Sequence, residues 1–307
     1  METKIYDSII IGAGPAGLTA GIYLSRAKQT VLIIDSGMAG GQIALTHEVA
    51  NYPGFESISG YMLSMTMKKQ AEKFGCEIKT NTKIKDYNIA GEIKEICINN
   101  GDCFKAKTII LATGGKSRKI GAKGEDTFAG RGISYCATCD GDFFQDREII
   151  VVGGGNSALE EAVSLTKYAS KVTIVHQFKE WQGFQRAIDE MEANPKIDYI
   201  LESKIIEFIG DQSLEKVIIE NQKTKERFEK KIDGVFIFIG YVPNTEKIEG
   251  LVELNKWKEI IVNNNYETNI SGVFAAGDSI VKRYRQITTA VADGTNAALN
   301  VIEYLNK

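Results

Sequence analysis

Two cysteines separated by two residues, Cys136 and Cys139, are the side chains in this sequence best suited to chemistry. A C-x-x-C pair can form a disulfide, and its geometry can lower the pKa of one thiol so that a thiolate exists near neutral pH. Such a thiolate attacks a partner's disulfide through a mixed-disulfide intermediate. The pair therefore predicts thiol–disulfide exchange.

Two other interpretations of the pair stay open. A zinc site needs about four ligands, but the chain has one C-x-x-C and two histidines, His47 and His176, neither at finger spacing. We therefore predict no metal site. Two buried, inert cysteines are the plainer alternative. The remaining cysteines of the five match no motif and are interpreted as ordinary packing or surface residues: Cys76, Cys97 and Cys103.

A repeat inside the chain predicts the elements around this pair. Residues 6–35 and 147–176 share one layout: an apolar strand, a glycine-rich turn, a helical stretch and a second apolar strand. This is the pattern of a dinucleotide-binding βαβ unit, in which glycines allow the tight turn and the backbone's approach to a pyrophosphate at the helix N-terminus. The matching positions are Gly12, Gly14 and Gly17 in the first copy and Gly153, Gly155 and Ala158 in the second. An ordinary strand–loop–helix turn is the alternative for each copy.

Asp35 ends the second strand of the first unit, where an acid usually accepts a hydrogen bond from a ribose 2′-hydroxyl. A plain turn aspartate is the alternative. Further buried strands are predicted at 107–115, 232–240 and 270–278, and a helix at 287–305. Polar hairpins or meanders, without site chemistry, are expected at 90–104 and 205–231.

The predicted fold class is α/β, with two Rossmann-like dinucleotide-binding domains. One domain is discontinuous, at 1–114 and 243–307, and the other is inserted at 115–242. A length of 307 residues suits two domains. The Gly114–Gly115 step and the segment 240–244 are the candidate hinges.

Bulk properties exclude some functions. The net charge of −3 argues against a nucleic-acid binder, which is usually basic. No apolar run is long enough to cross a bilayer, and we see no signal peptide at the N-terminus. We expect a cytoplasmic protein without a membrane partner.

Short motifs along nearly the whole chain resemble those of the low-molecular-weight thioredoxin reductases, in the same order. They are GAGPAG at 12–17, GGQ at 40–42, NYPG at 51–54, ATG at 112–114, CATCDG at 136–141, GGGNSALEEA at 153–162, GVFAAGD at 272–278 and YRQ at 284–286. The resemblance implies a homodimer with FAD in the first domain, a redox disulfide in the inserted NADPH-type domain, and thioredoxin as acceptor.

The resemblance also implies roles for single residues. Cys139 would face the flavin, Cys136 would attack the protein substrate, and Asp140 would move a proton to the departing thiolate. A capping role for Asp140 stays open. The FAD site would comprise Gly12, Gly14, Ala16, Gly17, Asp35, Gly41, Gln42, Asn51, Thr113, Gly114, Gly277, Asp278, Arg285 and Gln286.

One segment departs from the family. After the second strand of the second unit, NADPH-dependent members carry H-R-R-x-x-x-R, whose arginines bind the 2′-phosphate. Here His176 is followed by Gln177 and Phe178, and the third position is Gln182. The departure resembles the ferredoxin-linked, pyridine-nucleotide-independent flavin thioredoxin reductases of anaerobic bacteria. We therefore expect ferredoxin as donor, because FAD can accept electrons singly and deliver two to a disulfide.

The alternatives are an NAD(P)H-linked reductase with an unusual pocket, a reductase of another small redox protein, and a flavin-bearing sensor without turnover. Ferredoxins are usually acidic, so a basic docking patch is expected. The candidates are Lys116-Arg118-Lys119-Lys123 and, preferred for its place next to the expected flavin site, Lys282-Arg283-Arg285. Ordinary solvated charges are the alternative for both clusters.

Overall fold

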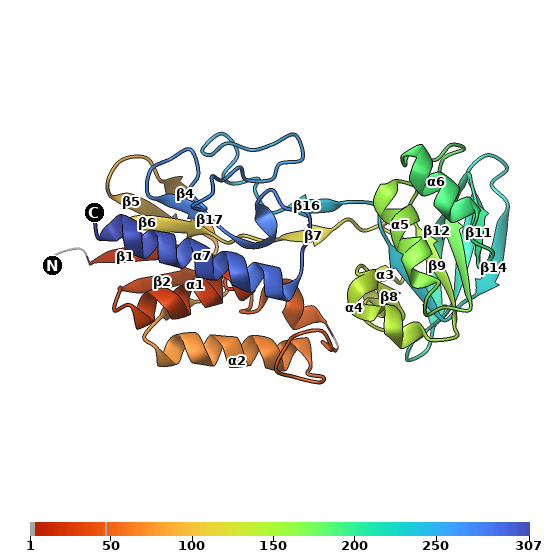
Figure 1. Ribbon diagram of the computed structural model, residues 1–307, viewed down its shortest axis with the longest axis horizontal. Helices are drawn as coiled ribbons and strands as arrows, with labels where there is room; N and C mark the ends of the chain where they lie inside the picture. The colour runs from red at the N-terminus through yellow and green to blue at the C-terminus, as the bar shows by residue number, and fades with distance from the viewer. Residues whose placement is uncertain (1–3, 47) are drawn as a thin grey trace. The chain divides into compact units, whose positions relative to one another are not determined.

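The computed structural model describes residues 4–46 and 48–307, so His47 lies outside the described residues (Figure 1). The chain divides into two compact units. Unit 1 comprises 1–116 and 242–307, and unit 2 comprises 117–241. The two segments that connect them carry the short strands β7 (Gly115–Ser117) and β16 (Tyr241–Pro243), which pair with each other.

Unit 1 is built on a seven-stranded sheet of order β3-β2-β1-β6-β5-β4, with β17 also paired to β6. Strands β1, β2, β3, β6 and β17 run parallel, whereas β4 and β5 form an antiparallel extension. The bounds are β1 Ile5–Ile11, β2 Val31–Ile34, β3 Glu77–Lys79, β4 Ile84–Asn88, β5 Lys94–Ile98, β6 Cys103–Leu111 and β17 Val273–Ala275.

Both faces of this sheet are covered, which explains its nearly continuous apolar strands. On β1, Ile10 packs with the helices α1 (Pro15–Arg26), α2 (Gly60–Lys73) and α7 (Ile287–Leu305). Ile9 and Ile11 pack on the opposite face with residues of the segment 248–280. Figure 1 shows α7 lying along α1. None of the described helices is at once long and apolar enough to pass through a membrane.

One sequence expectation in unit 1 was wrong. Cys97 and Cys103 are not ordinary packing or surface cysteines, because they form a disulfide across β5 and β6. Their positions are directly opposite each other in the antiparallel register. The pairing was missed because it depends on the register of a hairpin rather than on a motif. Cys76 is a buried free thiol, as expected of a packing residue.

Unit 2 is a second parallel sheet, of order β11-β10-β9-β15-β8, with an antiparallel sheet β12-β13-β14. Helices α5 and α6 cover one face, and β12 and β13 pack on the other. The strands are β8 Ile133–Ser134, β9 Glu148–Val152, β10 Lys171–Val175, β11 Ile197–Ile200, β12 Ser203–Gly210, β13 Leu214–Asn221, β14 Arg227–Lys231 and β15 Gly234–Ile237. The helices are α3 Glu125–Phe128, α4 Ala137–Asp140, α5 Asn156–Leu165 and α6 Gln185–Glu192. The predicted α/β class with two Rossmann-like sheets is confirmed.

Candidate redox and cofactor sites

The first glycine-rich turn connects β1 to α1 and is shaped by contacts that exclude side chains. A Cβ on Gly12 would lie 2.1 Å from the Ala112 carbonyl oxygen, and one on Gly17 would lie 1.9 Å from the Gly12 carbonyl oxygen. A Cβ on Gly14, in contrast, would meet nothing within 4 Å. Gly14 precedes Pro15 and is the N-cap of α1, so this open space lies next to the helix end that carries free N–H groups. The turn thus leaves room for an anion at a helix N-terminus.

Asp35 follows β2 and holds this turn in place. Its carboxylate accepts hydrogen bonds from the Ala13 N–H, at 2.6 Å, and from the Gly37 N–H, at 2.7 Å. One carboxylate therefore ties the glycine-rich turn to the loop after β2. The lone pairs that these bonds leave are available to a ribose hydroxyl.

A second group of predicted residues meets the same turn. The Gly40 N–H donates to the Ala13 carbonyl oxygen at 2.7 Å, and a Cβ on Gly41 would lie 3.5 Å from the Gly14 Cα. Gly41 and Gln42 begin the short helix η1 (Gly41–Leu45). The Asn51 side-chain amide donates to the Gln286 side-chain oxygen at 3.4 Å.

Two of the predicted cofactor residues in unit 1 have a buried side-chain oxygen without a hydrogen bond, although one of these oxygens, Asp278 Oδ1, lies 3.8 Å from Lys282 Nζ. Among the side chains that the structure describes, Thr113 Oγ1 and Asp278 Oδ1 are buried and have no hydrogen-bond partner. Thr113 and Gly114 follow β6, and Asp278 lies in the turn η3 (Gly277–Ser279) after β17. Burial raises the pKa of Asp278, and the nearby cations Lys282 and Arg285 partly offset this. Buried unpaired oxygens are costly unless a ligand satisfies them.

Asp293 on α7 is a supporting residue that the sequence did not point out. Its carboxylate accepts from the Gly277 N–H and the Tyr266 hydroxyl, each at 3.2 Å, and pairs with Lys282. Gly277 also packs on α1, since a Cβ there would lie 2.8 Å from the Ala16 Cβ. Nothing in the spacing of Asp293 and Lys282 signals this ion pair, because the partners come from different elements.

The preferred docking patch, Lys282-Arg283-Arg285, is only partly a surface cluster. Lys282 has a side chain that is 11% exposed and pairs with Asp293, and Arg285 pairs with Glu259. Arg285 also donates through Nε to the Asp278 carbonyl oxygen at 3.3 Å. Only Arg283 of this group is exposed. The charges of Lys282 and Arg285 therefore serve internal pairs. At the other cluster, Lys116, Arg118, Lys119 and Lys123 are all exposed.

The C-x-x-C pair lies in unit 2, between β8 and the helical turn α4. Cys136 and Cys139 form a disulfide, and both are partly exposed. Cys136 is the N-cap of α4, and its Sγ accepts a hydrogen bond from the Cys139 N–H at 3.2 Å. A sulfur at a helix N-terminus is an environment that favours the thiolate.

Asp140 is the neighbouring acid, and Ser134 holds it. The Ser134 hydroxyl donates to Asp140 Oδ2 at 2.5 Å and accepts from the Cys136 N–H at 3.0 Å. Burial raises the pKa of Asp140, the exposed neighbour Asp142 adds to this, and the Ser134 hydrogen bond opposes it. Ser134 was missed by the sequence reasoning, although its place two residues before Cys136 was a usable signal.

The second glycine-rich turn, between β9 and α5, is covered by the segment 177–184. The Gln182 N–H donates to the Gly154 carbonyl oxygen at 2.7 Å, and the Phe184 N–H donates to the Asn156 side-chain oxygen at 2.6 Å. Asn156 is the first residue of α5. The segment therefore lies against the helix N-terminus at which a pyrophosphate would bind.

Aromatic rings occupy the end of β10 in this unit. His176 is buried, stacks on Trp181 with ring centroids 5.5 Å apart, and meets the edge of Phe178 at 5.4 Å. Burial lowers the pKa of His176, so the ring is neutral at pH 7. Arg186 points along α6 to Glu190 and is 89% exposed. Gln177 and Phe178 thus put no charge at the two arginine positions, whereas Lys179, the next residue, is an exposed cation.

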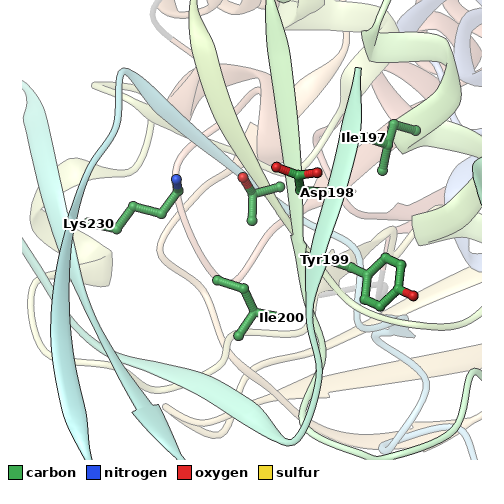
Figure 2. A pocket seen from close by; sticks show the side chains of 6 residues that line it. Ile197, Asp198, Tyr199, Ile200 and Lys230 are labelled. Atoms are coloured by element: carbon green, nitrogen blue, oxygen red, sulfur yellow. The ribbon is translucent and has the colours of Figure 1, made fainter. Parts of the chain in front are cut away.

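A surface depression in unit 2 lies apart from these groups. It is lined by Thr173 on β10, residues 197–200 on β11 and Lys230 on β14. Figure 2 shows Lys230 across from the β11 side chains. Asp198 in its wall pairs with Lys171. The depression contains neither the disulfide nor a glycine-rich turn, and we assign it no role.

Known proteins match this arrangement along almost the whole chain. The family model for pyridine nucleotide-disulphide oxidoreductases matches residues 6–294. The chain belongs to this family. FAD is the cofactor of the group to which it is related, and the protein is a flavoprotein oxidoreductase with a redox disulfide.

Individual relatives agree with this assignment. The chain is 45% identical to a 34.2 kDa protein in the rubredoxin operon of Clostridium pasteurianum, over 99% of this chain and 98% of that protein. It is 44% identical to a thioredoxin reductase of Bacillus subtilis, covering 100% of this chain and 96% of that protein. The crystal structure of a thioredoxin reductase from Streptococcus pyogenes is 41% identical and has a TM-score of 0.95, with 98% of both chains covered.

Proposed function

We propose that the protein is a thioredoxin reductase that takes its electrons from ferredoxin and passes them through FAD to the Cys136–Cys139 disulfide and then to thioredoxin. The observation that carries the choice of donor is the end of β10. There, Gln177 and Phe178 stand at the two positions where NADPH-dependent enzymes have arginines, and Phe178 packs edge-on against His176. We further propose that it works in the cytoplasm as a homodimer, as its resemblance to the thioredoxin reductases suggests.

The residues of unit 1 suit FAD. We propose that the pyrophosphate lies at the turn of Gly12, Gly14, Ala16 and Gly17, and that Asp35 accepts from the ribose. The buried oxygens of Thr113 and Asp278 would gain partners from the cofactor. Gly41, Gln42, Asn51, Gly114, Gly277, Arg285 and Gln286 would line the remaining site. FAD, when bound, supplies a carrier that receives electrons and delivers two to a disulfide.

Unit 2 supplies the thiol chemistry. Two electrons and two protons convert the Cys136–Cys139 disulfide to two thiols. We propose that Cys139 faces the flavin and that Cys136, at the N-terminus of α4, attacks the thioredoxin disulfide as a thiolate. Asp140 has a raised pKa, so it can hold a proton and give it to the departing sulfur. Cys139 then displaces thioredoxin from the mixed disulfide, and the Cys136–Cys139 bond forms again.

The second glycine-rich unit supports a donor other than NADPH. Two arginine–phosphate contacts of about 1.5–3 kcal/mol each are absent. Their loss would lower the affinity for NADPH by about two to four orders of magnitude. The segment 177–184 also bonds to the turn through Gln182 and Phe184. These contacts place the segment beside the N-terminus of α5, where a pyrophosphate would bind.

The test is anaerobic spectroscopy of the purified holoprotein mixed separately with NADPH, NADH and reduced ferredoxin, with thiols counted after each reaction. We expect only ferredoxin to bleach the flavin rapidly and to produce thiols. Rapid bleaching by micromolar NADPH would refute the donor and favour an NAD(P)H-linked reductase with an unusual pocket. Dithionite, which reduces flavins without docking, is the control for a competent flavin.

Cys139→Ser separates the reductase from a flavin-bearing sensor. In this variant ferredoxin should still bleach the flavin, but thioredoxin should no longer be reduced. Unchanged reduction of thioredoxin would end the two-cysteine mechanism.

A further inference from the structure

The Cys97–Cys103 disulfide lies outside the proposed electron route. Cys103 begins β6, whose other end leads to Thr113 and Gly114. At about 3.3 Å per residue, the strand separates the two ends by roughly 25 Å. The proposed flavin site at Thr113 is therefore too far from this disulfide for direct exchange, so any reductant must reach it from solvent.

The two cysteines occupy the outward face of the hairpin. Along β5, Ile96 and Ile98 are buried, whereas the alternating residues Glu95 and Cys97 are partly exposed. Cys103 is exposed. Cysteines that serve packing would occupy the Ile96 and Ile98 face instead, because side chains alternate along a strand. The sulfurs are thus placed where another thiol can approach them.

The cross-link adds little to the closure of the hairpin. Cys97 and Cys103 are six residues apart, and the turn between them is already closed by backbone bonds. The Ile98 N–H donates to the Asp102 carbonyl oxygen at 2.9 Å, and the Gly101 N–H donates to the Ile98 carbonyl oxygen at 3.0 Å. A disulfide stabilises mainly by constraining the unfolded chain, and the effect is smaller for a short loop such as this one. Opening this one should leave the fold intact.

We propose that Cys97 and Cys103 form a second site of reversible thiol–disulfide exchange, which takes small dithiols and dithiol proteins from solvent. In a cytoplasmic protein, disulfides are mostly transient, catalytic or redox-sensing, which favours exchange over a structural cross-link. This part of the argument rests on the proposed cytoplasmic location of the protein. The reduced thioredoxin made by the proposed reaction would be one dithiol of this class.

The exchange begins at Cys103, the more exposed of the two residues. A thiolate of the dithiol attacks Cys103 Sγ, the Cys97–Cys103 bond breaks, and Cys97 leaves as a thiolate that takes up a proton. The second thiol of the reductant then attacks the reductant's other sulfur, which is bonded to Cys103 in the mixed disulfide. Cys103 leaves and is also protonated. The site gains two electrons and two protons, and the dithiol loses the same number as its sulfurs join.

A metal site is the competing interpretation of the same residues. The ligand atoms of Glu95, Cys97 and Cys103 lie within 4.8 Å of one another. Lys105 lies 3.6 Å from the Glu95 carboxylate, however, and its positive charge opposes a cation there. Within the described chain the group offers three ligands, one fewer than a structural zinc site normally has.

The test uses the full-length, FAD-loaded variant Cys136→Ser/Cys139→Ser, so its outcome does not depend on the proposed catalytic route. The protein is equilibrated anaerobically in mixtures of reduced and oxidised dithiothreitol, quenched in acid, alkylated and digested with trypsin. Both cysteines fall on one tryptic peptide, between Lys94 and Lys105. We expect this peptide to carry either two alkyl groups or none, with proportions that follow the mixture reversibly and with an unchanged circular dichroism spectrum.

Three results would overturn the proposal. The disulfide could persist in every mixture until the protein is unfolded, which would make it structural. The thiols could fail to form the disulfide again in oxidised dithiothreitol. The reduced protein could bind one equivalent of zinc and then resist oxidation, which would make it a metal site. Adding Cys97→Ser/Cys103→Ser gives the matched control, and buried Cys76 reports unfolding.

Discussion

At the scale of single residues, the thiol site depends on how Ser134 and Asp140 are placed. Ser134 connects the Cys136 backbone to the Asp140 carboxylate, and burial gives that carboxylate a raised pKa. An acid of raised pKa is costly to the fold when ionised but useful as a proton donor. Activity and stability should therefore respond in opposite directions to its removal.

Asp140→Asn tests this opposition. Burial raises the folded-state pKa above the unfolded value, so the stability cost is absent below the unfolded pKa and fully present above the folded one. The variant should therefore melt at a higher temperature at pH 7. Its rate of thioredoxin reduction should fall on the order of 100-fold. The parent's rate should decline as the pH rises through the folded-state pKa of Asp140, and the variant's rate should not. Calorimetry and a pH–rate profile measure both effects.

The matched control is Asp142→Asn, which removes an exposed carboxylate from the same turn. It should change the melting temperature and the rate much less than Asp140→Asn does, because it removes only a smaller contribution to the raised pKa of Asp140. Equal losses of activity in the two variants, or a lower melting temperature for Asp140→Asn, would contradict the role given to Asp140.

At the scale of elements, the proposed cofactor site depends on the close approach of α1 and α7. A Cβ on Gly294 of α7 would lie 2.1 Å from the Ala16 carbonyl oxygen of α1. Asp293, the preceding residue, holds the Gly277 backbone and Lys282. One turn of α7 thus sets the position of both α1 and η3, which carry proposed FAD ligands.

Gly294→Ala and Gly14→Ala should separate folding from cofactor binding. The first adds a methyl group against backbone and should cost about 1–3 kcal/mol of unfolding free energy, which exceeds the helix propensity gained. The second adds a methyl group to open space at an ordinary φ of −78°. It should change the unfolding free energy of the apoprotein by less than about 1 kcal/mol but lower the affinity for FAD by at least about tenfold.

Urea unfolding of the apoproteins and FAD titration measure these two quantities. A Gly14→Ala protein that binds FAD with full affinity would show that the cofactor does not lie against this turn.

At the scale of the whole molecule, the net charge of −3 does not attract an acidic donor. Docking of such a donor therefore needs a local cluster of positive charge. Lys282 and Arg285 have internal partners, so the exposed group at 116–123 becomes the better candidate. Lys119 and Lys123 already pair with Asp126 and Glu207. Lys116 and Arg118 therefore remain the sharpest choice for a test.

Lys116→Glu/Arg118→Glu should slow reduction by ferredoxin about tenfold or more at low ionic strength, because like charges then meet at the interface. The effect should shrink as salt is added. Stopped-flow bleaching of the flavin measures the rate, and reduction by dithionite should be unchanged. Equal rates for the variant and the parent at low salt would exclude this surface.

The sequence by itself determined the α/β fold, because two glycine-rich βαβ patterns and their apolar strands are local signals. It also pointed to the redox pair through C-x-x-C and to the altered strand end through Gln177 and Phe178. These features need only residues that are close together along the chain.

Tertiary structure decided what depends on residues that are distant in sequence or on register. The Cys97–Cys103 disulfide follows from the β5–β6 register, and the internal pairing of Lys282 follows from the position of α7. The contact of Gln182 with Gly154 required the folded loop. Spacing along a chain does not encode which side chains meet once helices and strands have packed. That packing redirected the docking hypothesis and is the basis of the second proposed thiol-exchange site.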